Sequence, residues 1–123
     1  MAKAITSGGP VLGPYSPALQ LGGRLYISGQ IAIDPETGQL LEADISTQTR
    51  LVMEAIVRLL KAAGLDYEHL VKTTIFLADI NDFAQVNKVY EGYLHQPYPA
   101  RSTIEVAALP KGARIEIEAM AEA

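Results

Sequence analysis

Cysteine is absent from this 123-residue chain, and histidine occurs only twice, at His69 and His95. Without cysteine there is no disulfide framework, thiolate nucleophile, iron–sulfur cluster or zinc site with cysteine ligands. Two histidines are also too few for a multi-histidine metal centre within one chain. The composition therefore predicts neither thiol chemistry nor a metal centre.

Long apolar runs and an excess of basic charge are missing as well. No stretch approaches the roughly 20 apolar residues that span a bilayer. The opening segment, residues 1–17, lacks the continuous apolar core of a signal peptide. Ten basic against fourteen acidic residues give a net charge of −4, whereas nucleic-acid binders present a basic patch. We therefore expect a cytoplasmic protein with no membrane or nucleic-acid partner.

The common catalytic motifs do not occur either. The glycine pairs at positions 8–9 and 22–23 lack the spacing of a phosphate-binding loop, and no HExxH pattern is present. Ser28 is followed by Gly29, but Tyr26 stands where a nucleophile elbow needs glycine. Covalent catalysis receives no support from these patterns.

What is present is the pattern of one globular domain, residues 1–123, with 49% apolar and 20% charged residues. Turn residues and apolar periodicity predict the elements in order. They are hairpin strands within 19–41 (including a strand at 24–28), a helix over 44–63, a strand at 71–79, a helix over 82–95, and strands at 102–109 and 114–122. Asp44 is the expected N-cap of the first helix, and Gly64 follows its end.

This order predicts an α+β fold: a two-layer domain in which two helices cover one face of a mixed β-sheet. Alternation along the last strand puts Ile115 and Ile117 on one face and Glu116 and Glu118 on the other. The polar face is either a solvated sheet surface or the wall of a cleft that a neighbouring subunit completes. The pattern alone leaves both interpretations open.

A possible anion site lies at the start of the strand at 102–109. Arg101 and Thr103 are two residues apart and share a face, and the arginine fork matches a planar carboxylate. Taken alone, Arg101 can instead be an ordinary surface cation, and Glu116 a residue of a solvated strand. Tyr15, next to Pro14, can be an aromatic cover at the edge of the core. Asn87 can be an exposed helical amide.

Taken together, these residues lie in sequence blocks that occur in one order. The blocks are Gly13-Pro14-Tyr15, Ser28-Gly29-Gln30-Ile31, Val71-Lys72-Thr73-Thr74, Asn81-Asp82-Phe83, Val86-Asn87 with Tyr90-Glu91, Pro99-Ala100-Arg101-Ser102, and Leu109-Pro110-Lys111-Gly112-Ala113-Arg114-Ile115-Glu116-Ile117-Glu118-Ala119. From Gly13 to Ala119 the chain closely resembles the RidA (YjgF) family of reactive-intermediate deaminases, most specifically in the last block and the Arg101 segment.

The resemblance implies a fold like that of chorismate mutase and a homotrimer with clefts between subunits. It also implies hydrolysis of enamine and imine intermediates, such as 2-aminoacrylate and 2-iminobutanoate, to 2-oxoacids and ammonia without a cofactor. Arg101 falls on the family's substrate-carboxylate arginine and Glu116 on its water-positioning glutamate. Tyr15, Ser28 with Gly29, and Asn87 fall on positions that line the cleft.

Two departures from the family pattern concern the cleft. Many members carry cysteine where this chain has Thr103, and the loop 93–99 is shorter than in some members. The chemistry that the resemblance implies needs no thiol. Arg101 would hold the substrate carboxylate, Glu116 would activate a water that attacks the iminium carbon, and Thr103 would hydrogen-bond the carboxylate or the intermediate.

Two other functions remain open at this stage. The same arginine-lined cleft could hold 2-oxoacids or related metabolites without turnover. Some relatives of the family are ribonucleases or translation inhibitors, but the net charge of −4 and the scarcity of histidine argue against that activity here.

Overall fold

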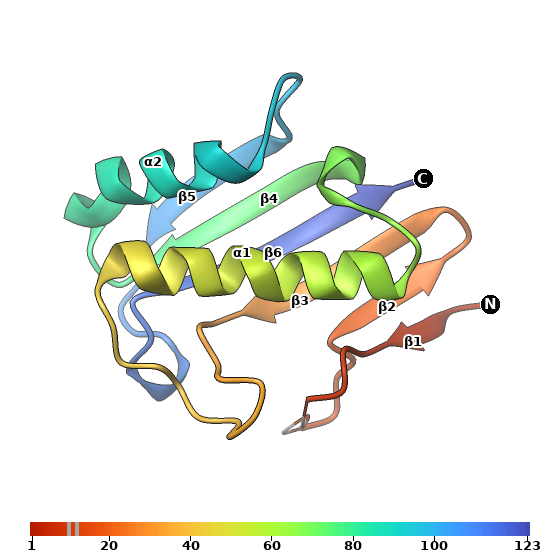
Figure 1. Ribbon diagram of the computed structural model, residues 1–123, viewed down its shortest axis with the longest axis horizontal. Helices are drawn as coiled ribbons and strands as arrows, with labels where there is room; N and C mark the ends of the chain where they lie inside the picture. Colours follow the sequence, from red (N-terminus) through yellow and green to blue (C-terminus); the bar gives the residue numbers. More distant parts are fainter. Residues whose placement is uncertain (10, 12) are drawn as a thin grey trace.

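Six strands form one sheet in the order β1-β2-β3-β6-β4-β5, and helices α1 and α2 lie across one of its faces (Figure 1). The computed structural model describes residues 1–9, 11 and 13–123. The elements are β1 (Lys3–Ile5), β2 (Ala18–Leu21), β3 (Arg24–Gln30), α1 (Ile45–Ala62), β4 (Leu70–Leu77), α2 (Phe83–Tyr93), β5 (Ala100–Glu105) and β6 (Ile115–Glu122). Short 3-10 turns span Tyr67–His69, Ile80–Asp82 and Pro110–Gly112. The predicted two-layer α+β architecture is confirmed.

The predicted hairpin over 19–41 is correct only in its first half. β2 and β3 are antiparallel, and Leu21 pairs with Arg24 across a two-residue turn in which Gly22 has φ +60°. Beyond Gln30 the chain forms a loop held by one isolated bridge between Ile33 and Leu40. The apolar residues at 31–33 therefore line a loop and do not extend the sheet.

Helix α1 begins and ends as its capping residues predict. The Asp44 carboxylate accepts a hydrogen bond from the Thr47 amide at 2.8 Å, which satisfies one of the free amides of the first turn. Gly64 follows the helix with φ +79°, a conformation that favours glycine. The stripe that includes Val52 and Ile56 is fully buried against the sheet.

The last two strands are consecutive in sequence but are not neighbours in the sheet. β5 is an edge strand parallel to β4, whereas β6 lies between β3 and β4 and is antiparallel to both. β5 ends at Glu105, four residues earlier than predicted, because the chain must leave the edge and return to the centre. The Pro110–Gly112 turn lies on that return path.

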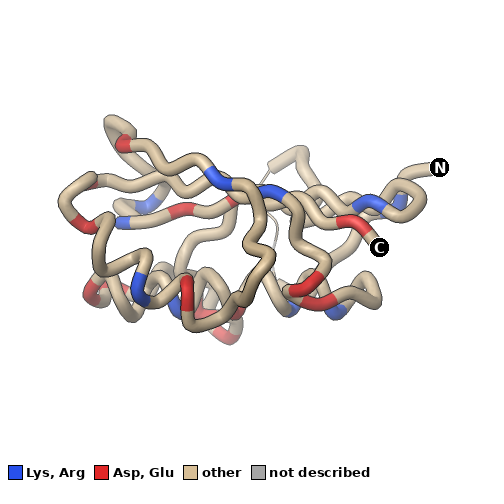
Figure 2. The backbone as a smooth tube through the Cα atoms, turned by 90° about the horizontal axis from the view of Figure 1, so that it is seen from above, with Lys and Arg blue, Asp and Glu red and all other residues tan. Residues whose placement is uncertain are grey.

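The two faces of the sheet differ as the alternation in β6 predicts. Ile115 and Ile117 are fully buried under the helices, and Glu116 and Glu118 lie on the face without helices. Seen edge-on, the sheet and the helices form two layers (Figure 2). Large apolar residues stay 36–46% exposed on the uncovered face: Leu19, Tyr26, Ile104 and Met120. In the part of the chain that the structure describes, no helix has the length and apolar character to cross a membrane.

Candidate functional site

Arg101 lies on the edge strand β5 and points toward helix α2. Its strand partner in β4 is Thr73, which is 1% exposed beneath the helices, so the two side chains share that face. The guanidinium lies over the rings of Tyr90 and Phe83, 5.1 and 5.5 Å from their centroids. Its Nη1 donates to Asn87 Oδ1 at 2.7 Å. Three α2 side chains thus orient the arginine and leave part of its fork for a ligand.

The aromatic support beneath Arg101 is itself fixed. The Tyr90 hydroxyl lies 2.7 Å from Thr73 Oγ1, and Tyr90 is 5% exposed. Burial raises the pKa of the Tyr90 phenol, so the ring remains a neutral surface for the cation. In the sequence, Phe83 and Tyr90 fall on the apolar stripe of the helix, a pattern typical of core residues. Their spacing of four and three residues from Asn87 is the signal that could have linked them to the site.

Thr103 follows Arg101 on the same face of β5, as predicted. Its hydroxyl oxygen is buried and has no hydrogen-bond partner within residues 1–9, 11 and 13–123. A buried hydroxyl without a partner costs about 1–3 kcal/mol. The oxygen is therefore available to a ligand, a water or another chain beside the guanidinium.

Glu116 lies on the opposite face of the sheet, in the central strand β6. Its carboxylate packs so closely on Gly29 that a Cβ built there would be 2.5 Å from Glu116 Oε2. A side chain at position 29 would therefore displace the Glu116 carboxylate from this position. Burial, and secondarily the negative charge of Glu118, raise the pKa of the Glu116 carboxyl.

Glu116 borders a cavity of about 690 Å³ between the β1–β2 loop, the β3–α1 loop and the start of β6. Tyr15, Ser28 and Gly29 line it as well, and Tyr15 is 56% exposed. Ser28 Oγ donates to the carbonyl of Ser16 at 2.7 Å, so it is left with acceptor capacity toward the cavity. The structure thus brings together four of the predicted site residues.

The predicted residues consequently form two half-sites. The Arg half-site holds Arg101, Thr103 and Asn87 on the helix side of the edge strand; the Glu half-site holds Tyr15, Ser28, Gly29 and Glu116 at the cavity. Strand pairing places Arg101 level with Thr73 and, on the next strand, with Ala119, so these three side chains share one face. Glu116 is an odd number of residues, three, from Ala119 along β6. The side chains of Arg101 and Glu116 therefore point to opposite faces of the sheet. Within a single chain the two half-sites therefore lie apart, and the expectation that Arg101 and Glu116 act on one ligand in a cleft between subunits stays a prediction.

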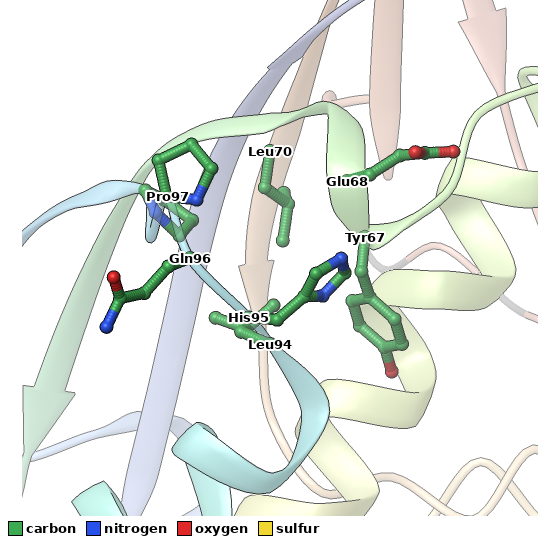
Figure 3. Close-up of a pocket in the computed structure, with 8 residues that line it drawn as sticks. Tyr67, Glu68, Leu70, Leu94, His95, Gln96 and Pro97 are labelled. Carbon is green, nitrogen blue, oxygen red and sulfur yellow. The ribbon is translucent and has the colours of Figure 1, made fainter.

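A second, much smaller cavity lies between the end of α2 and the start of β4 (Figure 3). Tyr67 and His95 line it with Leu70 and Leu94, and its volume is about 70 Å³. That space suits a few waters rather than a substrate. Within the described residues no group of three or more His, Cys, Asp or Glu side chains could hold a metal ion.

Comparison with known proteins gives one consistent result. The family model described as Endoribonuclease L-PSP matches residues 6–123. The human protein named 2-iminobutanoate/2-iminopropanoate deaminase is 49% identical over 110 residues, 89% of this chain and 80% of its own length. A solved Rid family protein from Yersinia pestis is 48% identical over all of both chains, with a TM-score of 0.95. TdcF from E. coli, solved with bound serine, is 42% identical over 98% of each chain, with a TM-score of 0.91.

Proposed function

Because the chain belongs to the RidA group of the family described as Endoribonuclease L-PSP, we propose that it is a 2-iminobutanoate/2-iminopropanoate deaminase. The reaction adds water to the C=N bond of a 2-imino acid and releases a 2-oxoacid and ammonia. Identity of 49% to a relative with this name supports the proposal. The observation that carries it is an oriented arginine and a partly buried carboxylate among the residues that resemble the family's site.

In this mechanism the Arg half-site binds and the Glu half-site activates water. Two N–H groups of Arg101 hold the substrate carboxylate, and the unpaired hydroxyl of Thr103 donates a hydrogen bond beside them. Glu116 accepts a proton from the water that attacks C2 of the iminium, and the carbinolamine then loses ammonia. The iminium is already electrophilic, so the step needs neither a metal nor a covalent nucleophile. The bound serine of TdcF supports a site for small amino-acid-like ligands.

We also propose that the two half-sites meet between subunits of a homotrimer in the cytoplasm. Within one chain Arg101 and Glu116 point to opposite faces, so one ligand can touch both only across two copies. The uncovered sheet face, with Leu19, Tyr26 and Met120 exposed, supplies apolar surface for such an assembly. The absence of cysteine is compatible with the reducing cytoplasm.

The test of the activity is the clearance of 2-iminobutanoate that an amino-acid oxidase generates in the assay. We expect the purified protein to accelerate formation of 2-oxobutyrate and ammonia over the spontaneous rate. Calorimetry with 2-oxobutyrate runs in parallel. Binding of 2-oxobutyrate without acceleration would contradict the deaminase and would instead indicate a metabolite-binding module.

The shared site predicts complementation between two inactive variants. Arg101→Ala and Glu116→Gln chains are unfolded together in equal amounts, refolded, and assayed beside each variant refolded alone. Random mixing in a closed ring leaves about one cleft in four with both wild-type residues, so about a quarter of wild-type activity should return. No recovery in mixed oligomers, confirmed by mass spectrometry, would show that each site lies within one chain.

A further inference from the structure

Gln48 is a polar side chain on the core side of helix α1, only 1% exposed. Both ends of its amide are satisfied by backbone groups of two other segments. Nε2 donates to the carbonyl of Leu41 at 3.1 Å, and Oε1 accepts from the amide of Arg114 at 3.0 Å. Burial makes each of these hydrogen bonds costly to lose. The side chain therefore bridges the end of the β3–α1 loop and the segment that leads into β6.

The two bridged segments are walls of the cavity that holds Glu116. The β3–α1 loop contributes five lining residues: Ile31, Ile33, Asp34, Pro35 and Gly38. The segment before β6 contributes Pro110 and Lys111. Lys111 also donates to the Gly38 carbonyl at 3.3 Å, but Lys111 is exposed, whereas the Gln48 side chain is buried. Gln48 is thus the buried connection between these walls.

Glu116 is two residues from the amide that Gln48 holds. The pairing of β6 with β3 reaches only to Ile117, and that of β6 with β4 begins at Ile115. The Arg114 carbonyl accepts from Ala78, and the acceptor for the Arg114 amide is Gln48 instead of a strand carbonyl. The start of β6, next to the carboxylate over Gly29, is thus held by β4 through its backbone and by a side chain of α1 at the Arg114 amide.

We propose that Gln48 is a positioning residue for Glu116: its bridge from Leu41 to Arg114 holds the start of β6 so that the carboxylate points into the cavity. This inference rests on the proposed deaminase function. Gln48 lies on the far side of the sheet from Glu116 and does not line the cavity, so it acts only through the backbone. The Arg half-site is held by other contacts, those of Asn87, Phe83 and Tyr90. Its link to the Gln48 bridge is the 3.4 Å ion pair between the Arg114 side chain and Asp82 at the start of α2.

Thr49 provides a matched control. It is the next residue of α1, it is fully buried, and its hydroxyl donates to the Ile45 carbonyl of its own helix at 2.7 Å. Thr49→Val therefore removes one buried hydrogen bond at nearly constant shape without touching either cavity wall. This variant therefore tests whether the loss of a buried hydrogen bond in α1 is by itself enough to lower activity.

The experiment compares Gln48→Met and Gln48→Asn with wild type and Thr49→Val. Methionine keeps the length but makes neither hydrogen bond, and asparagine keeps the amide but is one methylene too short to span both partners. Per folded protein, we expect kcat for 2-iminobutanoate to fall about 10- to 100-fold in both Gln48 variants, because a misdirected Glu116 carboxylate activates water poorly. The Kd for 2-oxobutyrate should change by less than about threefold, because Arg101 binds it. Thr49→Val should keep kcat within about twofold of wild type.

Unchanged kcat in the Gln48 variants would overturn the assignment. So would an equal loss in Thr49→Val, or a Kd that weakens as much as kcat falls. A crystal structure of Gln48→Asn supplies a readout that needs no activity. If wild type is inactive, the deaminase proposal fails, and this structure still decides the role of Gln48. A Glu116 carboxylate displaced from Gly29 supports it, and an unmoved carboxylate overturns it.

Discussion

Replacement of Arg101 by alanine is expected to lower kcat/KM for 2-iminobutanoate by about 10²- to 10⁴-fold. In the proposed site the fork makes two charge-assisted hydrogen bonds to the substrate carboxylate. Each contributes about 1.5–3 kcal/mol, and about 1.4 kcal/mol corresponds to a factor of ten. The measurement is the rate of 2-oxobutyrate formation from imine generated in the assay, corrected for spontaneous hydrolysis. Calorimetry should show the same loss in the affinity for 2-oxobutyrate.

Two further variants separate the fork from the charge. Arg101→Lys keeps a positive charge but not the planar pair of donors, so its activity should lie between those of wild type and Arg101→Ala. Arg50→Ala removes an exposed arginine on α1, whose Nη2 donates a 3.4 Å hydrogen bond to Thr47 Oγ1. It should stay within about twofold of wild type. Near-normal turnover by Arg101→Ala would remove the carboxylate clamp from the mechanism.

The second large effect is expected at Glu116. Glu116→Gln keeps the size of the side chain but cannot accept a proton from water, so kcat should fall by about 10²- to 10⁴-fold. The affinity for 2-oxobutyrate should change little, since Arg101 is intact. Full activity in this variant would restrict Glu116 to shaping the cavity.

The same variant should fold at least as stably as wild type at neutral pH. Burial raises the pKa of the Glu116 carboxyl above that of an unfolded chain, so the folded state binds the proton more tightly. As the pH rises from the pKa of the unfolded carboxyl to that of the folded one, ionisation of Glu116 lowers the free energy of unfolding. The neutral amide of Glu116→Gln removes this destabilisation. Thermal unfolding of wild type and Glu116→Gln at pH 7 tests this expectation. A large fall in the Tm of the variant would mean that its lost activity reflects unfolding.

Glu118→Gln is the matched control for pH dependence. Glu118 is exposed two residues further along the same face of β6, and its charge is the smaller of the two causes that raise the pKa of Glu116. The active form of Glu116 is ionised, so activity falls as the pH is lowered through its pKa. Without Glu118 the acid limb of kcat/KM should move to lower pH, while the rate at alkaline pH stays close to wild type.

Much of the fold could be predicted because its elements are decided locally. Asp44, Gly64 and the apolar stripe between them specify α1 by capping and periodicity, which act within a few residues. Alternation likewise assigned Ile115 and Glu116 to opposite faces. The position of β6 between β3 and β4 depends on pairings far apart in sequence, and no local pattern reports them.

The site was predicted less completely, because it too depends on pairings between residues far apart in sequence. Arg101 and Thr103 share a face, as their spacing requires, and Ser28, Gly29 and Glu116 do meet at one cavity. That the arginine and the glutamate face away from each other follows from the strand order, which the sequence does not display. The role of Gln48 was also missed, because a buried glutamine looks like any helical amide until its partners 7 and 66 residues away are seen.

The central place of β6 also bears on how the protein is made. β6 follows all the other strands in the chain, yet it joins β3 to β4, and these two are not paired with each other. During synthesis the edges of β3 and β4 keep unpaired backbone N–H and C=O groups, and the apolar face of the sheet stays divided, until residues 115–122 are available. Ribosome-bound chains that end before Ile115 should therefore be sensitive to proteases and should bind chaperones, and folding should complete in a single late step.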